Sequence, residues 1–132
     1  MKNKKSKGFT LIELIVVISM ILVFAGFLIP KFAGYQARAK ETKAINTAKQ
    51  IQTAAMSSYS EMNGIFDSAG VTSTVTTLTG AESVSSTLGA DGKSITVKYT
   101  SDSNDYNAII TDDSSGFKVY KGKDTTNPIY PK

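Results

Sequence analysis

Glu13 is the residue whose chemistry most needs an explanation. It is the only charged residue in the 21-residue stretch from Phe9 to Ile29, where Thr10 and Ser19 are the only other clearly polar residues. A carboxylate inside an apolar span is costly unless another group pairs with it. Either Glu13 lies near the membrane surface, where water between the headgroups reaches it, or its charge has a defined partner.

Few other residues offer catalytic or metal-binding chemistry. The 132 residues include no His, Cys or Trp, so there is no imidazole base, no thiolate and none of the ligands that zinc, copper and iron prefer. Asp112 and Asp113, followed by two serines, offer oxygen ligands for calcium, although a turn between strands explains them better. We therefore expect no enzyme activity, no cofactor and no bound metal.

The net charge of +4 is concentrated at the N-terminus. The chain has 15 Lys and Arg against 11 Asp and Glu, and four of the lysines lie in residues 1–8. From Phe9 onward the basic and acidic residues balance, so the charge does not by itself indicate a nucleic-acid partner. Lysines and an arginine do follow the apolar stretch, but we see no aromatic and basic stripe among them, and nucleic-acid binding stays unsupported.

The apolar stretch predicts a membrane span. As a helix, 21 residues extend about 32 Å, which matches a hydrocarbon core of about 30 Å. Its apolar residues occupy every face of the helix, unlike those of a soluble amphipathic helix. The lysines before it predict a cytoplasmic N-terminus and an exported body. A secretory signal peptide is the alternative, but the stretch is long for one and lacks its small-residue cleavage site.

A second helical segment is expected over residues 31–63. Its apolar residues recur every three or four positions and draw one stripe, while Asn63 and Gly64 indicate a helix end. Pro30 lies before this segment and removes the backbone hydrogen bond to the carbonyl of Gly26, four residues earlier. We expect a kink between Gly26 and Pro30; the alternative is that the first helix ends at Pro30.

Residues 64–132 are expected to form a Ser/Thr-rich loop followed by a small antiparallel sheet. Residues 68–88 are rich in Ser and Thr and indicate a surface connection with at most short structured pieces. Three strand-like runs follow, at 94–100, 106–111 and 117–121, separated by short polar turns. The fold class is therefore α+β, with a long N-terminal helix packed against a sheet of about three strands.

The sequence KGFTLIELIVV, from Lys7 to Val17, resembles the class III signal of type IV pilins and the related pseudopilins. The match consists of a basic leader, the Gly8-Phe9 junction, an acid at the fifth position after the junction and an apolar helix. The resemblance implies a pilin-like fold. It also implies that a prepilin peptidase removes residues 1–8 by cutting between Gly8 and Phe9 and then methylates the amino group of Phe9.

The resemblance further implies a structural role in a helical filament. The membrane lipid holds the subunit through residues 9–30 before an assembly platform in the inner membrane adds it to a homo-oligomeric pilus on the cell surface. Glu13 would then pair with the Phe9 amine of an adjacent subunit. Such pili serve adhesion, twitching motility or DNA uptake. The alternatives are a pseudopilin of a type II secretion or DNA-uptake system, and a single-pass membrane protein that carries an exported binding domain.

Overall fold

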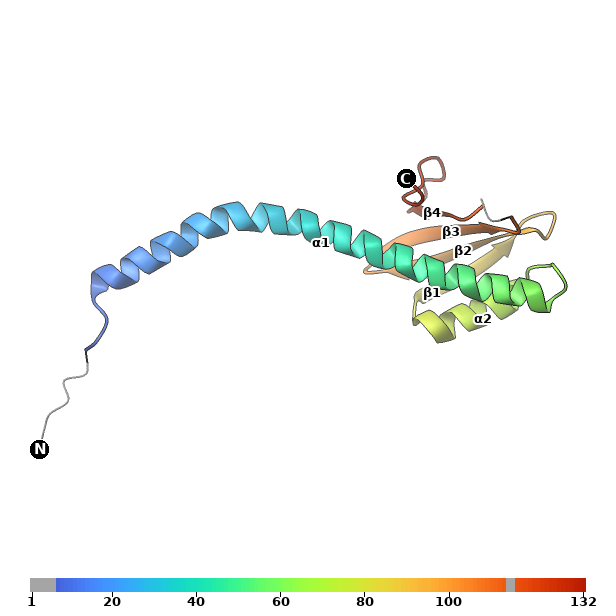
Figure 1. The fold of residues 1–132 in the computed structure, drawn as a ribbon, viewed down its shortest axis with the longest axis horizontal. Coiled ribbons are helices and arrows are strands. Elements are labelled where there is room, and N and C mark those ends of the chain that lie inside the picture. The colour runs from blue at the N-terminus through green and yellow to red at the C-terminus, as the bar shows by residue number, and fades with distance from the viewer. Residues whose placement is uncertain (1–6, 114–115) are drawn as a thin grey trace, which may run out of the picture. The chain divides into compact units, whose positions relative to one another are not determined.

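The structure is a computed structural model, and it describes residues 7–113 and 116–132. The chain forms two compact units, one ending at Arg38 and the other comprising residues 39–132. The elements, labelled in Figure 1, are α1 (Leu11–Glu61), α2 (Ser68–Thr79), β1 (Glu82–Leu88), β2 (Ser94–Ser101), β3 (Asn104–Thr111) and β4 (Lys118–Lys121).

Helix α1 is continuous over 51 residues, with Pro30 inside it. The alternative that the helix ends at Pro30 is therefore wrong. Proline has no N–H to donate to the carbonyl of Gly26, so one helical hydrogen bond is missing here, and the expected kink stays a prediction. The predicted end of the helix is confirmed, because Asn63 and Gly64 follow α1 with φ of 57° and 85°, the left-handed conformation that stops a helix.

The four strands form one antiparallel sheet in the order β1-β2-β3-β4. Strands β2 and β3 form a hairpin in which Ile95 pairs with Ile110 and Tyr99 with Tyr106. Asp102 and Ser103 make the two-residue turn between them, both with positive φ, as the right-handed twist of a hairpin requires. Every second side chain of β2, at positions 95, 97 and 99, is buried in the core, as the spacing predicts.

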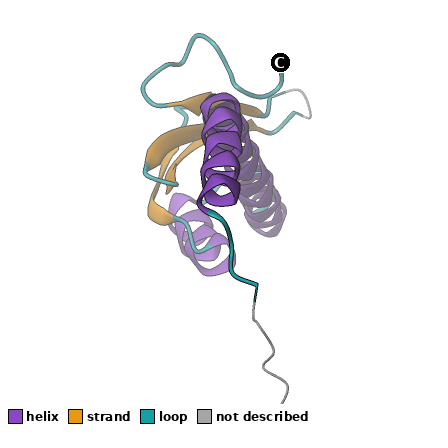
Figure 2. Ribbon diagram, turned by 90° about the vertical axis from the view of Figure 1, so that its left-hand side faces the viewer, coloured by secondary structure: helices purple, strands orange, loops and turns teal. Residues whose placement is uncertain are grey.

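The core of the second unit lies between one face of the sheet and the helices. Figure 2 shows the strands as one layer with helices on one side of it. Small residues of α1, Ala44, Ala48 and Ala55, are fully buried together with Ile51, so the helix backbone can approach the sheet closely. The predicted apolar stripe of α1 is confirmed at these positions, and the α+β class with it.

The Ser/Thr-rich segment differs from the prediction, because it forms α2 and β1 and not a loop. The side chain of Asp67 caps the start of α2 by accepting hydrogen bonds from the backbone N–H groups of Ala69 and Gly70, and Gly80 ends the helix in the left-handed conformation. Val71 and Val75 of α2 are completely buried. The sheet accordingly has four strands where the sequence indicated about three.

The C-terminal residues are fastened to both the sheet and α1. The N–H of Ile129 donates to the carbonyl of Val119 at 2.7 Å, and the N–H of Val119 donates to the carbonyl of Tyr130 at 2.9 Å. The ammonium of Lys49 lies 4.9 Å from the centre of the Tyr130 ring, a cation–π contact. The chain has no cysteine to close this region covalently, so these contacts hold the tail in place.

Tyr99 joins the sheet to α1 through a buried hydrogen bond, and its removal should weaken the fold measurably. Its hydroxyl donates to the carbonyl of Ala44 at 2.7 Å. Tyr99→Phe should lower the free energy of unfolding by about 1 kcal/mol at neutral pH. Urea unfolding of the detergent-solubilised chain, followed by circular dichroism, measures this change. Tyr35→Phe is the control, because the ring of Tyr35 is exposed and should give no change.

The same variant should alter how stability depends on pH. Burial, and secondarily the neighbouring Tyr106, raises the pKa of Tyr99 above its ordinary value of 10.0. The folded chain therefore holds this proton more tightly than the unfolded chain, so stability is present below about pH 10 and is lost as the pH rises through the raised pKa. Tyr99→Phe should flatten this loss without abolishing it, because burial also raises the pKa of Tyr106. An unchanged slope would contradict the assignment.

Candidate functional site

The predicted cleavage junction lies in exposed chain just before α1. Gly8, Phe9 and Thr10 precede the first helical residue, Leu11, and the side chain of Phe9 is 95% exposed. Beyond its two neighbours, no heavy atom of residues 7–113 and 116–132 lies within 4 Å of the position that a Cβ on Gly8 would occupy. A protease could therefore reach the bond between Gly8 and Phe9 without unfolding any helix or strand.

Glu13 holds the start of α1 together with Thr10. The carboxylate of Glu13 accepts a hydrogen bond from the N–H of Thr10 at 3.2 Å, and the hydroxyl of Thr10 accepts one from the N–H of Glu13 at 3.3 Å. These reciprocal bonds form a capping box, which satisfies two N–H groups that a helix start would otherwise leave unpaired. The acid also lies in the first helical turn, where the helix dipole favours negative charge.

Thr10 is a functional residue that the sequence analysis missed. The pattern that reveals it, a threonine followed three residues later by a glutamate before an apolar run, is present in the sequence. The predicted partner of Glu13 is the amine of Phe9. In this chain, which carries residues 1–8, the nitrogen of Phe9 is an amide, so the pairing of Glu13 with a free amine stays a prediction.

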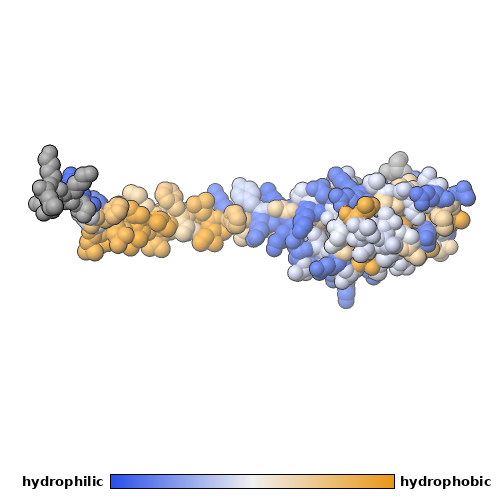
Figure 3. Space-filling model, turned by 90° about the horizontal axis from the view of Figure 1, so that it is seen from below, coloured by the Kyte–Doolittle hydropathy of each residue, from blue (hydrophilic) through white to orange (hydrophobic). Residues whose placement is uncertain are grey.

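The apolar part of α1 presents its side chains outward. The large apolar residues from Leu11 to Ile29 are between 45% and 77% exposed, and Figure 3 shows them gathered along the N-terminal part of the helix. This part of α1 is long and apolar enough to cross a membrane. Soluble proteins rarely leave so large an apolar surface uncovered.

Gly26 lies within this surface, in the helix that runs on through Pro30. No heavy atom lies within 4 Å of the position of a Cβ on Gly26, so the chain itself does not need a glycine there for packing. A glycine inside a helix lowers its stability relative to alanine. Together with the missing hydrogen bond at Pro30, this makes the segment the weakest part of the apolar half of α1.

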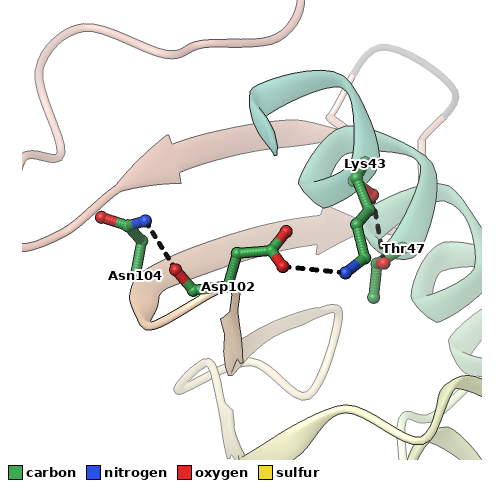
Figure 4. A network of polar contacts seen from close by, with 4 residues as sticks. All are labelled: Lys43, Thr47, Asp102 and Asn104. Carbon is green, nitrogen blue, oxygen red and sulfur yellow. Dashed lines mark hydrogen bonds and ion pairs between the residues drawn. The ribbon is translucent and has the colours of Figure 1, made fainter. Parts of the chain in front are cut away.

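Several charged groups in the second unit pair within the chain. Lys43 binds the carboxylate of Asp102 at 3.0 Å, while the carbonyl of Lys43 accepts from Thr47 and the carbonyl of Asp102 accepts from Asn104 (Figure 4). These contacts tie the β2–β3 turn to α1. Because the side chain of Lys43 is 63% exposed, the ion pair itself contributes little to stability, and it forms no catalytic arrangement.

The part of the chain that the structure describes does not bring together the ligands of a metal site. Residues 7–113 and 116–132 contain no cluster of three His, Cys, Asp or Glu residues that could hold a metal ion. The two serines of the candidate calcium site, Ser114 and Ser115, lie outside the described residues. The carboxylate of Asp113 accepts a hydrogen bond from the hydroxyl of Thr111 at 2.7 Å, as in a turn beside a strand.

Comparison with known proteins identifies the N-terminal motif. Residues 3–29 match the family model described as "Prokaryotic N-terminal methylation motif". The apolar span, the Gly8-Phe9 junction and Glu13 all lie inside the matched range. No solved structure matches the chain.

Three curated relatives are similar to about half of the chain. The "Type IV major pilin protein PilA" of Myxococcus xanthus is 40% identical over 65 residues, which are 49% of this chain and 30% of the relative. A "Fimbrial protein" of Pseudomonas aeruginosa is 41% identical over 66 residues, 50% of this chain and 43% of the relative. The "Type IV major pilin protein PilE" of Neisseria gonorrhoeae is 40% identical over 75 residues, 54% of this chain and 44% of the relative.

These matches confirm the resemblance to type IV pilins. The chain spans less than half of the length of these three relatives. The family model covers residues 3–29, which include most of the apolar stretch.

Proposed function

We propose that this protein is a pilin, a structural subunit that polymerises into a type IV pilus filament and has no catalytic site or cofactor. The observation that carries the proposal is the methylation motif at residues 3–29, which places an exposed Gly8-Phe9 junction directly before a capped apolar helix. The similarity to pilins and fimbrial proteins supports a structural subunit over an enzyme.

Processing by a prepilin peptidase is the first step. The enzyme cuts between Gly8 and Phe9 and methylates the new amino group of Phe9. Removing residues 1–8 removes four lysines, which help to set the orientation of the span but would be costly in an apolar environment. Cleavage also creates one cation, the Phe9 ammonium, close to the Glu13 carboxylate.

The subunit is stored in the cytoplasmic membrane before assembly. Its N-terminus faces the cytoplasm, residues 9–30 cross the membrane, and the sheet lies outside. The exposed apolar side chains of α1 support this arrangement, because lipid covers them until the assembly platform moves the subunit into the filament. In the filament other copies of α1 cover the same surface, and the segment of Gly26 and Pro30 kinks or loosens there.

The charge of Glu13 then sets the position of each subunit relative to the next. In the single chain the carboxylate accepts a hydrogen bond from the N–H of Thr10 at 3.2 Å, a weak neutral donor. In the filament it pairs with the Phe9 ammonium of an adjacent subunit. Burial of the apolar side chains supplies most of the attraction between subunits. Because an unpaired charge in the apolar interior is strongly unfavourable, only the axial offset between subunits that pairs Glu13 with Phe9 is stable.

Two other functions are compatible with an apolar N-terminal helix. A pseudopilin of a type II secretion or DNA-uptake system shares the same N-terminal signal, but the relatives described above are named as pilins or fimbrial proteins, which favours a pilus. A single-pass binding protein would need neither the cleavage junction nor an acid at one set position. Adhesion, twitching motility and DNA uptake are roles of the assembled pilus.

Shearing cells tests the proposal. We expect filaments of micrometre length in the sheared fraction, made of this protein and beginning at an N-methylated Phe9. Electron microscopy and mass spectrometry of the purified filaments measure both features. If the protein begins at Phe9 but remains with the membranes as short assemblies, a secretion pseudopilin is the better assignment. Protein that keeps residues 1–8 and never assembles would contradict both.

A further inference from the structure

A basic and aromatic stripe follows the apolar part of α1. Lys31, Gly34, Tyr35 and Arg38 line one hollow of about 270 Å³ on the surface of the first unit. Their spacing of three or four residues places them on one face of the helix. Tyr35 lies between Lys31 and Arg38 in this hollow.

Gly34 opens the hollow, and no other part of the chain requires a glycine at this position. Apart from the adjacent residues and the backbone of its own helical turn, no heavy atom of the described residues lies within 4 Å of the place that a Cβ on Gly34 would occupy. A glycine in a helix interior is unfavourable relative to alanine. The space beside Gly34, between two cations and a tyrosine, is therefore open to a group from outside this chain.

The two cations have no acidic partner within the described chain. Among the residues that the structure describes, neither Lys31 nor Arg38 forms an ion pair. The sequence from Leu14 to Lys40 contains no Asp or Glu. Lys31 and Arg38 lie two helical turns apart on the same face, and one anion bound between their long side chains can pair with both.

The distance of these residues from the end of the apolar span predicts that they lie at the membrane surface. At 1.5 Å per residue, Lys31 lies about 3 Å and Arg38 about 14 Å beyond Ile29, the last residue of the apolar span. The headgroup region extends about 5 to 8 Å beyond the hydrocarbon core. Helical side chains lean toward the N-terminus, so those of Tyr35 and Arg38 lean back toward the apolar span.

We propose that Lys31, Gly34, Tyr35 and Arg38 form a site for the phosphate of an anionic phospholipid at the outer surface of the membrane. The site rests on the proposed membrane span and not on filament formation. The guanidinium of Arg38 can bind the two free oxygens of the phosphodiester, the ammonium of Lys31 shares one of them, and the hydroxyl of Tyr35 donates at the interface. Continuity with the apolar span favours lipid over nucleic acid, because acyl chains can lie along the span.

The bound lipid fixes the depth of the helix in the membrane. It neutralises the two cations and holds residues 31–38 at the headgroups while the subunit waits for assembly. The subunit must release this lipid when it leaves the membrane, so the site sets part of the barrier to extraction.

Lipid retention by the full chain tests the site. The chain is inserted into nanodiscs of equal parts phosphatidylcholine and phosphatidylglycerol, released, and weighed by native mass spectrometry. We expect the wild type to retain phosphatidylglycerol about tenfold over phosphatidylcholine, and Lys31→Gln with Arg38→Gln to reduce this preference to about twofold. Lys118→Gln with Lys121→Gln removes two exposed lysines from β4 and should keep the wild-type ratio.

A second variant separates the hollow from the charge. Gly34→Leu keeps both cations and fills the space beside them, and we expect it also to lower the preference for phosphatidylglycerol. Adding free glycerol phosphate tests whether a soluble phosphate suffices; we expect no displacement of lipid, and full displacement would overturn the lipid assignment. Displacement by a short DNA duplex would overturn it in favour of nucleic acid.

The remaining outcomes separate this site from the proposed topology. A wild-type chain that enters nanodiscs and retains both lipids equally would overturn the site and leave the membrane span intact. A chain that does not enter nanodiscs at all would overturn both. Loss of the preference in the β4 control pair as well as in the Lys31 and Arg38 pair would assign it to net charge and overturn the site.

Discussion

Cells that make the Glu13→Ala variant are expected to insert and cleave the protein and to assemble no filaments. The substitution leaves the Phe9 ammonium of each neighbouring subunit without a partner in an apolar interior. Removing one member of a buried ion pair costs about 3 to 5 kcal/mol, which corresponds to at least about a hundredfold loss at each subunit contact. Immunoblots of the sheared and membrane fractions, with the mass of the membrane-held protein, measure this result.

Two variants separate the charge of Glu13 from its role in the capping box. Glu13→Gln keeps a side-chain oxygen that can accept from the N–H of Thr10, as Glu13 does at 3.2 Å, and so preserves the helix start. It removes the charge, so it should also abolish filaments. Thr10→Ala keeps the carboxylate and loses the hydroxyl, which weakens the helix start by about 1 kcal/mol. That variant should assemble at a lower yield.

The opposite pattern would change the assignment of Glu13. If Glu13→Gln formed normal filaments and Thr10→Ala formed none, the residue would matter for starting the helix and not for pairing subunits. Normal filaments from Glu13→Ala would exclude both roles. The structure makes this comparison necessary, because it shows that the only charge in the apolar span already serves the fold of its own helix.

The elements that could be predicted from the sequence are those with strong periodicity. Strands β2, β3 and β4 lie within two residues of their predicted bounds. In β2, for example, every second residue, Ile95, Val97 and Tyr99, is apolar and buried in the core. The end of α1 could be predicted from Asn63 and Gly64, which adopt the left-handed conformation. In each case one local rule and the tertiary structure agree.

Helix α2 could not be predicted because its sequence favours other conformations. Serine and threonine compete with the helix by bonding to nearby backbone groups. In the structure the hydroxyls of Thr76, Thr77 and Thr79 donate to carbonyls four residues earlier and so remain compatible with the helix. The burial of Val71 and Val75 outweighs the weak local preference, which is a tertiary effect.

The sequence of strand β1 lacks the alternation of apolar and polar residues that predicts a strand, for a different reason. It is an edge strand, and the core-facing Ser86 pairs with Val97 of β2 where an apolar residue would be expected. The hydroxyl of Ser86 donates to the carbonyl of Ser68 and contacts the hydroxyl of Thr72, both in α2. A polar residue is therefore accepted on this face because α2 satisfies it, and α2 was itself not predicted.

Gly8→Val should stop processing and leave the fold unchanged. Beyond the adjacent residues, a Cβ at this position meets no heavy atom of the described part of the chain within 4 Å, so we expect the effect to arise in the peptidase, whose site must admit the residue before the cut. The protein should keep residues 1–8 and an unmethylated Phe9, and no filaments should form, because the ammonium that pairs with Glu13 is never made. The intact mass of the membrane-held chain measures cleavage directly.

Gly26→Val is the matched control, since a side chain on Gly26 also meets nothing within 4 Å. It lies inside the span and far in sequence from the junction, so it should be cleaved and methylated like the wild type. Filament formation by uncleaved Gly8→Val would show that the new amine is dispensable, and the pairing of Phe9 with Glu13 would fail with it. Failure of processing in both variants would instead mean that the peptidase reads the helix as well as the junction.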